Sequence, residues 1–325
     1  MHKTLSPPLT SEFEKDVHKG LTDFPKHLSS KYFYDKKGDR LFQDIMAMPE
    51  YYLTNCEYDI LETYQHEICQ LFSKGPNTFN LIELGAGDGK KTKILLRHLS
   101  ENKIDFKYLP IDISQNALDQ LNVSIQKELP QVTTETLQGT YFEVLESIAK
   151  LNGTRKVILF LGSNIGNLLH HQAIDFLNRI QELMTDDDLL FMGFDQKKDP
   201  QTILDAYNDA QGITAAFNKN LLSRINSELD ADFNIEDFLH WEVYDPETGT
   251  AKSYLVSKRE QSVRINKIDL NVHFKQWETI HTEISQKYDD QIVARLAKKA
   301  HLKIVTEFSD TDNRYKNYVF KKSST

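Results

Sequence analysis

Three glycines in the first third of the chain could bring a ligand close to the main chain. Gly85, Gly87 and Gly89 directly follow an apolar run at Phe79–Leu84. Glycine adopts positive φ without strain and has no Cβ, so a small molecule could lie against the backbone of this turn. Asp112 ends the next apolar run, where a carboxylate could accept hydrogen bonds from both hydroxyls of a ribose. These residue types together predict a site for a small ligand that carries a ribose.

The spacing of the glycines separates the known kinds of glycine-rich turn. A dinucleotide fingerprint needs a glycine at the position of Lys90, and a P-loop needs a Gly-Lys pair followed by Ser or Thr, which is missing at the required spacing. The segment Glu83–Gly89 instead resembles the first motif of the class I methyltransferases, whose turn holds the amino acid end of S-adenosylmethionine. Two structural alternatives stay open: the glycines could only form a tight turn, and Asp112 could cap a helix that begins near Ser114.

Patterns typical of strands and helices alternate around this turn. The expected strands are Phe79–Leu84, Phe106–Ile111, Lys156–Leu161 and Asp188–Phe194. The expected helices are Lys90–Leu99, Ser114–Glu128 with Ser114 as N-cap, and Gln172–Met184. Strands that alternate with helices at this spacing predict a mainly parallel, doubly wound α/β sheet.

The pattern changes after Pro200. A long helical region over Thr202–Leu229 is followed by the strand-like pieces Leu239–Tyr244 and Lys252–Ser257. A helix over Tyr288–Ala300 and a closing antiparallel hairpin, with strands Leu302–Phe308 and Asn317–Lys321 joined across Asp310–Asn313, would return the chain to the sheet. We therefore expect a core domain of residues 57–200 and 286–325, and a smaller α+β cap of residues 12–56 and 201–285, whose N-terminal part we expect to be irregular. Substrates of α/β proteins usually bind between such parts.

Composition narrows the class of partner. The chain has 39 Lys and Arg against 48 Asp and Glu, a net charge of −9, so its field would repel a nucleic acid backbone. Cys56 and Cys69 have no spacing typical of a zinc site or a disulfide framework. We find no long apolar run and no signal peptide pattern at residues 1–8. We expect a soluble, cytoplasmic monomer that acts on a small molecule and binds neither metal, nucleic acid nor membrane.

Several separated motifs carry a more specific resemblance. Nearly the whole chain resembles the histidine-specific Nα-methyltransferases, the family of the first step of ergothioneine biosynthesis. The matching segments, in chain order, are Tyr32–Asp35 with Gly38, Leu41-Phe42, Pro49–Tyr52, Glu83–Gly87 with Lys91-Thr92, Phe160–Leu168, and Thr282–Ser285. The resemblance implies a Rossmann-like class I methyltransferase fold and transfer of methyl groups from S-adenosylmethionine to the α-amino nitrogen of L-histidine, with repeated rounds leading to the trimethyl betaine.

The resemblance also implies the site residues. Those for the cofactor are Gly85, Lys91, Asp112, Thr140 and Tyr141; those for the amino acid are Tyr51, Gly162, Asn167, Tyr207, Glu283 and Ser285. The chemistry suits these residue types. The Asn167 amide oxygen could accept from the α-amine and orient its lone pair, the tyrosines could bind the carboxylate, and Tyr34 could order a water near the amine. Glu283 and Ser285 alternate on a strand-like segment and so share one face, where they could bind both imidazole nitrogens.

Two positions depart from the family pattern. Thr140-Tyr141 stands where the family usually has Gly-Asp-Phe with the Asp on the adenine amino group, and Ser253 stands where the histidine enzymes, as we align them, carry a Met that packs on the imidazole. Another amino acid, or a histidine derivative, is therefore an alternative substrate. A non-catalytic module that binds the cofactor or an amino acid is an alternative of a different class.

Structural alternatives also exist for single site residues. Asn167 could cap the following helix, Glu283 could be a strand charge paired with Lys287, and Tyr51 could be a packing aromatic.

Overall fold

The chain forms two compact units. The computed structural model describes residues 9–75, 78–151 and 153–323, so residues 1–8, where we found no signal peptide pattern, lie outside the described part. Unit 1 consists of Met1–Tyr52 and Lys198–Ser285, and unit 2 of Leu53–Lys197 and Gln286–Thr325. Within the described residues, no helix combines the length and the apolar character that crossing a bilayer requires.

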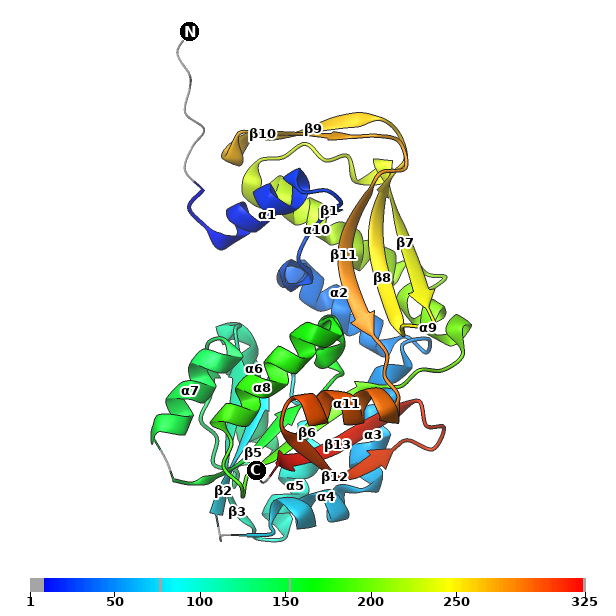
Figure 1. Ribbon diagram of the computed structural model, residues 1–325. Helices are drawn as coiled ribbons and strands as arrows, with labels where there is room; N and C mark the ends of the chain where they lie inside the picture. Colours follow the sequence, from blue (N-terminus) through cyan, green and yellow to red (C-terminus); the bar gives the residue numbers. More distant parts are fainter. Residues whose placement is uncertain (1–8, 76–77, 152, 324–325) are drawn as a thin grey trace. The chain divides into compact units, whose positions relative to one another are not determined.

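Unit 2 is built on a seven-stranded sheet (Figure 1). From edge to edge its strands are β12 (Leu302–Ser309), β13 (Tyr315–Lys322), β6 (Leu189–Asp195), β5 (Arg155–Phe160), β2 (Thr78–Leu84), β3 (Asp105–Asp112) and β4 (Leu137–Gln138). The strands from β6 to β4 are parallel, whereas β13 runs antiparallel between β6 and β12. The predicted class I methyltransferase sheet with its closing hairpin is confirmed.

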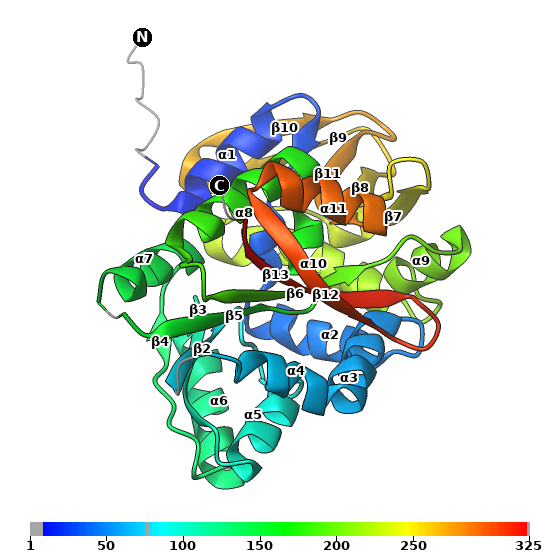
Figure 2. The ribbon, with the colours of Figure 1, turned by 60° about the horizontal axis from the view of Figure 1, so that its bottom comes forward.

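Helices cover both faces of this sheet, as Figure 2 shows. One face carries α4 (Gln65–Phe72), α5 (Thr92–Glu101) and α6 (Gln115–Glu128), and the other α7 (Tyr141–Leu151), α8 (His170–Leu183) and α11 (Asp290–Lys299). Ser114 is the N-cap of α6, as expected, because its Oγ accepts from the Ala117 backbone N at 3.2 Å. Three helices begin two residues from the expected position: α5 at Thr92 rather than Lys90, α8 at His170 rather than Gln172, and α11 at Asp290 rather than Tyr288.

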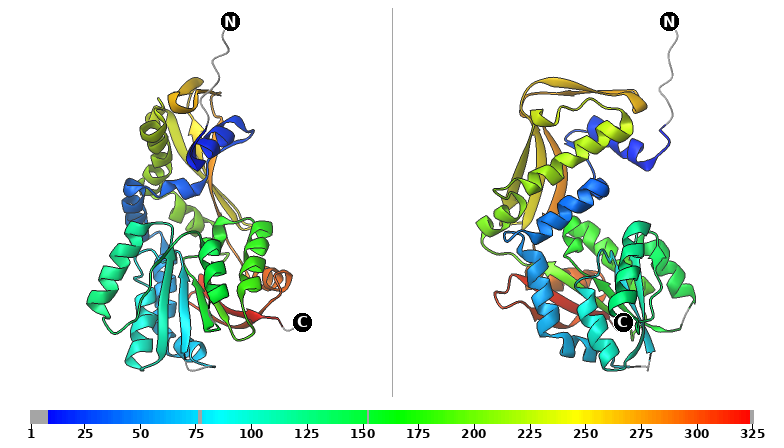
Figure 3. Two further views of the ribbon diagram at one scale, coloured as in Figure 1. Left: turned by 90° about the vertical axis from the view of Figure 1, so that its left-hand side faces the viewer. Right: turned by 180° about the vertical axis from the view of Figure 1, so that it is seen from behind.

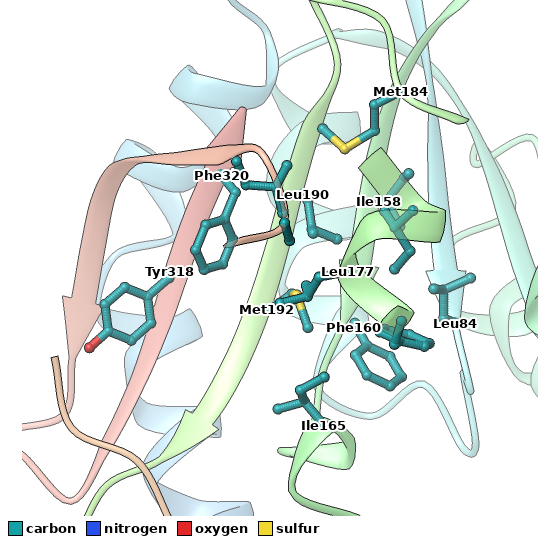
Figure 4. Close-up of a cluster of buried hydrophobic side chains, with 14 of the residues drawn as sticks. Leu84, Ile158, Phe160, Ile165, Leu177, Met184, Leu190, Met192, Tyr318 and Phe320 are labelled. Carbon is teal, nitrogen blue, oxygen red and sulfur yellow. The ribbon is translucent and has the colours of Figure 1, made fainter. Parts of the chain in front are cut away.

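The covered sheet explains the apolar runs of the sequence. Every residue of β5 and β6 is buried, and all of β2 except its first residue. Parallel strands buried on both faces are apolar along their whole length rather than in alternation. In Figure 4 the side chains of Phe160 and Met192 lie close to Leu177 of α8, with Tyr318 and Phe320 of β13 beyond β6. Because these strands are parallel, their carboxyl ends all lie at the same edge of the sheet, where ligands of α/β proteins bind.

Unit 1 contains a four-stranded sheet and a separate hairpin. The sheet order is β1 (Lys26–His27), β11 (Thr279–Gln286), β8 (Thr250–Ser257) and β7 (Phe238–Asp245); the hairpin consists of β9 (Gln261–Ile265) and β10 (Leu270–Phe274). The long helix α10 (Ile213–Leu229) packs along the strands of this sheet (Figure 3). Its buried side chains join Phe238, Leu255 and Ile280 in one apolar core. The mixture of helix and sheet agrees with an α+β unit.

Two sequence-based expectations for unit 1 are wrong. The segment before residue 57, expected to be irregular, contains α1 (Glu12–Thr22), α2 (Lys36–Ala47) and the start of α3 (Tyr52–Thr63). A capping box of Ser11 with Glu14 begins α1, and the Asp35 carboxylate accepts from the Gly38 backbone N at 2.6 Å to begin α2. We overlooked these caps.

The single helical region expected over Thr202–Leu229 is also divided. It forms α9 (Pro200–Tyr207) and α10, separated by a turn that ends at Gly212 with φ +76°. The Asp209 carboxylate accepts from the backbone N of Ile213 at 3.0 Å and of Thr214 at 2.8 Å. These hydrogen bonds satisfy the first backbone N–H groups of α10. Gly212, at positive φ, allows the chain to change direction between the two helices, which one continuous helix would not.

We expect Gly193→Ala to destabilise unit 2. A Cβ at Gly193 would overlap with Tyr315 Oη and with Glu57 Oε1. Both side chains are fully buried, so neither can move aside cheaply. The free energy of unfolding, measured in urea, should fall by roughly 2 kcal/mol. The matched control is Gly153→Ala, whose Cβ would meet no described atom within 4 Å at an exposed position; its effect should stay within about 0.5 kcal/mol. Equal losses in the two variants would contradict the packing argument.

A second prediction concerns Glu83, a buried carboxylate in β2. Burial raises its pKa from the ordinary value of 4.5 to about 7, although Thr92 Oγ1 at 2.5 Å and Tyr108 Oη donate to it and oppose the rise. The folded protein therefore holds this proton more tightly than the unfolded chain. The stabilisation is complete below pH 4.5 and is lost as the pH rises through about 7.

Glu83→Gln removes the group that titrates and keeps its shape. Between pH 4.5 and pH 8, the stability of the variant relative to the wild type should therefore rise, by up to roughly 3 kcal/mol. Urea unfolding at a series of pH values measures the difference. A constant difference across this range would show that Glu83 does not titrate there.

Candidate functional site

The glycine turn after β2 leaves its backbone accessible. Gly85 has φ +74° and donates its N–H to the Ile111 carbonyl at 2.9 Å, which ties the turn to the end of β3. A Cβ at Gly85 would lie 2.7 Å from Tyr141 Oη and 3.7 Å from Asn164 Nδ2. A Cβ at the exposed Gly87 would meet no described atom within 4 Å. A glycine is thus required at 85 for close packing, while 87 leaves room for a ligand.

Asp112 stands beside this turn at the end of β3. Its Oδ1 accepts from the Ser114 backbone N at 2.9 Å, and its Oδ2 accepts a long bond from the Gly87 N–H at 3.4 Å. The carboxylate is half-buried, and a carboxylate has about four acceptor positions, of which these bonds use two. Asp112 therefore helps to form the turn before α6, where Ser114 is the N-cap, and still retains capacity to bind hydroxyls.

Lys91 lies next to the turn at Gly162. Its Nζ forms an ion pair with Glu57 Oε2, and a Cβ at Gly162 would lie 3.7 Å from that Nζ. Gly162 has φ +76° and donates its N–H to the same Glu57 oxygen at 2.7 Å. Gly162, which we expected on the amino acid side, is thus adjacent to an expected cofactor residue. We did not predict Glu57, which had no motif to mark it.

Thr140 and Tyr141 lie at the start of α7. The exposed Thr140 donates its backbone N–H and its hydroxyl to Glu143 Oε2, at 3.3 and 2.5 Å, so its hydroxyl oxygen keeps lone pairs for a donor. Both bonds lower the pKa of Glu143, the hydroxyl bond more. Burial, and to a lesser degree the Asp112 carboxylate, raises the pKa of Tyr141 to about 12, which keeps the phenol neutral. The structure thus gathers Gly85, Asp112 and Tyr141.

Asn167 follows the end of β5. It closes the short 3₁₀ helix η2 (Asn164–Asn167), which begins after Ser163 in the left-handed region at φ +55°. The next helix, α8, has Leu169 as its N-cap residue, and the Leu169 N–H donates to Gln172 Oε1 at 2.9 Å. The alternative that Asn167 caps this helix is wrong. The Asn167 side chain is exposed, at the carboxyl edge of the sheet where ligands of α/β proteins bind.

Unit 1 holds a row of aromatic side chains that includes three predicted residues. Tyr34 packs edge-on against Phe42 at 5.5 Å between ring centroids, Phe42 against Tyr51 at 6.4 Å, and Tyr51 against Tyr207 at 6.3 Å. The row ends at Ser285, whose Oγ shares a 2.7 Å hydrogen bond with Tyr207 Oη. Tyr34 is exposed, Tyr51 half-buried and Tyr207 buried. The row thus runs from an exposed ring to a buried one.

The backbone carbonyl of Tyr207 is hydrogen-bonded to a residue that we did not predict. The buried His240 accepts from Asn218 Nδ2 at its Nδ1, at 2.8 Å, and therefore donates from Nε2 to the Tyr207 carbonyl at 2.9 Å. Burial lowers the pKa of His240, which favours this neutral ring. A histidine on a strand carries no motif, so only its neighbours reveal this role.

Glu283 and Ser285 lie on β11 with alternate spacing, so their side chains leave the same side of the strand. Both are half-buried. On the neighbouring strand β8, Ser253 is buried and donates its hydroxyl to Glu242 Oε2 of β7 at 2.6 Å. In unit 2, Lys287 forms a 2.7 Å ion pair with Asp195, with both side chains almost completely buried.

The predicted residues are divided between the units. Unit 2 contains Gly85, Lys91, Asp112, Thr140, Tyr141, Gly162 and Asn167, and unit 1 contains Tyr34, Tyr51, Tyr207, Glu283 and Ser285. In unit 2 these residues lie at or after the carboxyl ends of β2, β3, β4 and β5, and in unit 1 the Tyr207–Ser285 hydrogen bond joins α9 to β11.

Comparison with known proteins identifies the family. Residues 13–322 match the model of a family described as histidine-specific, S-adenosylmethionine-dependent methyltransferases. A histidine N-alpha-methyltransferase of Mycolicibacterium smegmatis is 36% identical over 87% of each chain. Ergothioneine biosynthesis protein 1 of Schizosaccharomyces pombe is 31% identical over 91% of this chain and 39% of its own. N-methyltransferase imqF of Aspergillus flavus is 27% identical over 92% of this chain and 82% of its own. This chain, with its glycine turn, its Asp112 and its class I sheet, belongs to the histidine-specific, S-adenosylmethionine-dependent methyltransferase family.

Proposed function

We propose that this enzyme transfers methyl groups from S-adenosylmethionine to the α-amino nitrogen of L-histidine. The observation that carries the choice of substrate is the set of Glu283, Ser285 and Tyr207 in unit 1, joined to membership of the family. The relatives named for histidine methylation support the same substrate. Repeated transfer to the trimethyl betaine is part of the proposal.

The residues of unit 2 fit the cofactor. Asp112 has acceptor positions left for ribose hydroxyls, Lys91 offers an ammonium group to a carboxylate, and the backbone at Gly85 and Gly87 admits close approach. Thr140 and Tyr141 would contact the adenine. When bound, S-adenosylmethionine supplies an electrophilic methyl group on a sulfonium. We accordingly propose residues 57–200 and 286–325 as the cofactor-binding domain and residues 12–56 and 201–285 as the amino acid-binding domain.

The residues proposed for the amino acid have matching chemistry. The Glu283 carboxylate and the Ser285 hydroxyl can each bind one imidazole nitrogen, and Tyr51 and Tyr207 can donate to the substrate carboxylate. The Asn167 amide oxygen can accept from the α-amine and so direct its lone pair, while Tyr34 orders a water beside it. Once the α-amine is neutral, the enzyme's contribution is therefore orientation and exclusion of water. A monomer in the cytoplasm remains part of the proposal.

One observation favours a second candidate substrate. Ser253 and Glu242 form a buried polar pair where, in our alignment, the histidine enzymes have a methionine against the imidazole. A carboxylate in this place would suit a histidine derivative or another amino acid that presents an additional hydrogen-bond donor. The relative named simply as an N-methyltransferase is compatible with other substrates in the wider family.

The deciding experiment is mass spectrometry of the twenty amino acids and histidine derivatives after incubation with the enzyme and S-adenosylmethionine. Histidine should gain up to three methyl groups in succession. If a different amino acid gains mass and histidine does not, the histidine assignment is wrong. Calorimetric binding of the cofactor and an amino acid, with no turnover of any compound, would instead identify a non-catalytic binding module.

Replacement of Glu283 should act selectively on the amino acid. Glu283→Gln takes away a charged acceptor for an imidazole N–H, and a hydrogen bond to a charged group contributes about 1.5–3 kcal/mol. The KM for histidine should therefore rise about 10-fold to 100-fold while the KM for S-adenosylmethionine changes little.

The matched control is Glu260→Gln, an exposed carboxylate of the same unit, which should leave both constants unchanged. An equal rise of both KM values in Glu283→Gln would indicate a general disturbance of the structure rather than contact with the substrate.

A further inference from the structure

A buried carboxylate, Glu57, joins three separate parts of unit 2. It lies on α3 with a side chain exposure of 0%. Its Oε2 accepts from Lys91 Nζ and from the Gly162 N–H at 2.7 Å. Its Oε1 accepts from Tyr315 Oη at 3.0 Å and from Asn317 Nδ2 at 2.9 Å. Both oxygens are therefore satisfied, each by two donors.

The two oxygens of Glu57 face different neighbours. The Oε1 partners belong to β13, in the closing hairpin, whereas the Oε2 partners lie in the loops that follow β2 and β5. A buried carboxylate without donors would be costly, and four donors including an ammonium group offset that cost. Because Glu57 is completely buried and fully bonded, it has no capacity to bind a ligand itself. Its effect on a ligand must pass through Lys91 and Gly162.

We propose that Glu57 is a positioning residue for the cofactor. It fixes the Lys91 ammonium group and the turn at Gly162 in the arrangement that the amino acid end of S-adenosylmethionine requires. A lysine side chain that is free to move loses conformational freedom when a ligand orders it. In this chain Glu57 orders Lys91 before the cofactor arrives, so binding does not bear that cost. The inference rests on the proposed role of Lys91 at the cofactor.

A double-mutant cycle measured by calorimetry tests this inference. The ligand is S-adenosylhomocysteine, which has the same amino acid end, and the variants are Glu57→Gln, Lys91→Met and the two together. In Glu57→Gln the amide places either a donor against Lys91 and Gly162 or a donor against Tyr315 and Asn317, so the arrangement of four donors is lost. We expect each single variant to raise the Kd about 10-fold, and the double variant to raise it by clearly less than the product of the two, because only the contribution through Gly162 remains once Lys91 is removed.

The matched control is another buried ion pair of unit 2. Asp188 Oδ2 lies 2.8 Å from Lys156 Nζ at the beginning of β5, at the opposite end of the strand from Gly162, with exposures of 0% and 6%. Asp188→Asn should lower the melting temperature but leave the Kd unchanged. If this variant weakens binding as much as Glu57→Gln, the role of Glu57 is only structural and the inference is wrong.

The other outcomes separate this inference from the proposed function. The positioning role is overturned if Glu57→Gln leaves the Kd unchanged or lowers it. It is also overturned if Glu57→Gln changes the Kd by the same factor in the wild type and in Lys91→Met. In both cases the proposed contact of Lys91 with the cofactor still stands. An unchanged Kd in Lys91→Met removes Lys91 from the cofactor site, and the inference with it. If Glu57→Gln does not fold by circular dichroism, Glu57→Asp replaces it: the carboxylate is retained but drawn back by one methylene, and a wild-type Kd would then overturn the inference.

Discussion

The carboxylate of Glu57 is the constraint on which the loops around the glycine turn of unit 2 depend. A charge that is fully removed from water must be compensated by donors, and here they come from the loop after β2, the turn after β5, and β13. The same requirement explains why position 193 is a glycine, since a Cβ there would enter the space of Glu57 and Tyr315. One buried charge thus links the closing hairpin of the sheet to the loops around the glycine turn.

The residues of unit 1 that we propose for the amino acid have a different kind of support. The hydrogen bond between Tyr207 and Ser285 lies at the end of the row of packed rings. The neutral His240 donates to the backbone carbonyl of Tyr207. No ion pair is needed among these groups, since neutral donors, acceptors and ring contacts suffice to hold them. Exchange of single side chains can alter the specificity of such a site, and Ser253, which donates to Glu242, is a position at which we expected this chain to depart from the family pattern.

The sequence was informative where local chemistry decides the structure. Alternation of apolar runs and helical patterns predicted the parallel sheet of unit 2, because strands buried on both faces must be apolar throughout. Ser114 was predicted as the N-cap of α6 because capping is a property of a few adjacent residues. The N-terminal helices and the division at Gly212 also have local signals, namely Asp35, Asp209 and Gly212, which the expected elements did not include.

The sequence by itself determined the family, the glycine turn and the types of residue available to each substrate. Only the tertiary structure decided which of them act together. Lys91 is 34 residues from Glu57, and Tyr207 is 78 residues from Ser285 and 33 from His240. Hydrogen bonds and burial between such distant residues depend on how the elements pack, and no local periodicity records them. For this reason Glu57 and His240 could not be predicted from motifs, whereas Gly85 and Asp112 could.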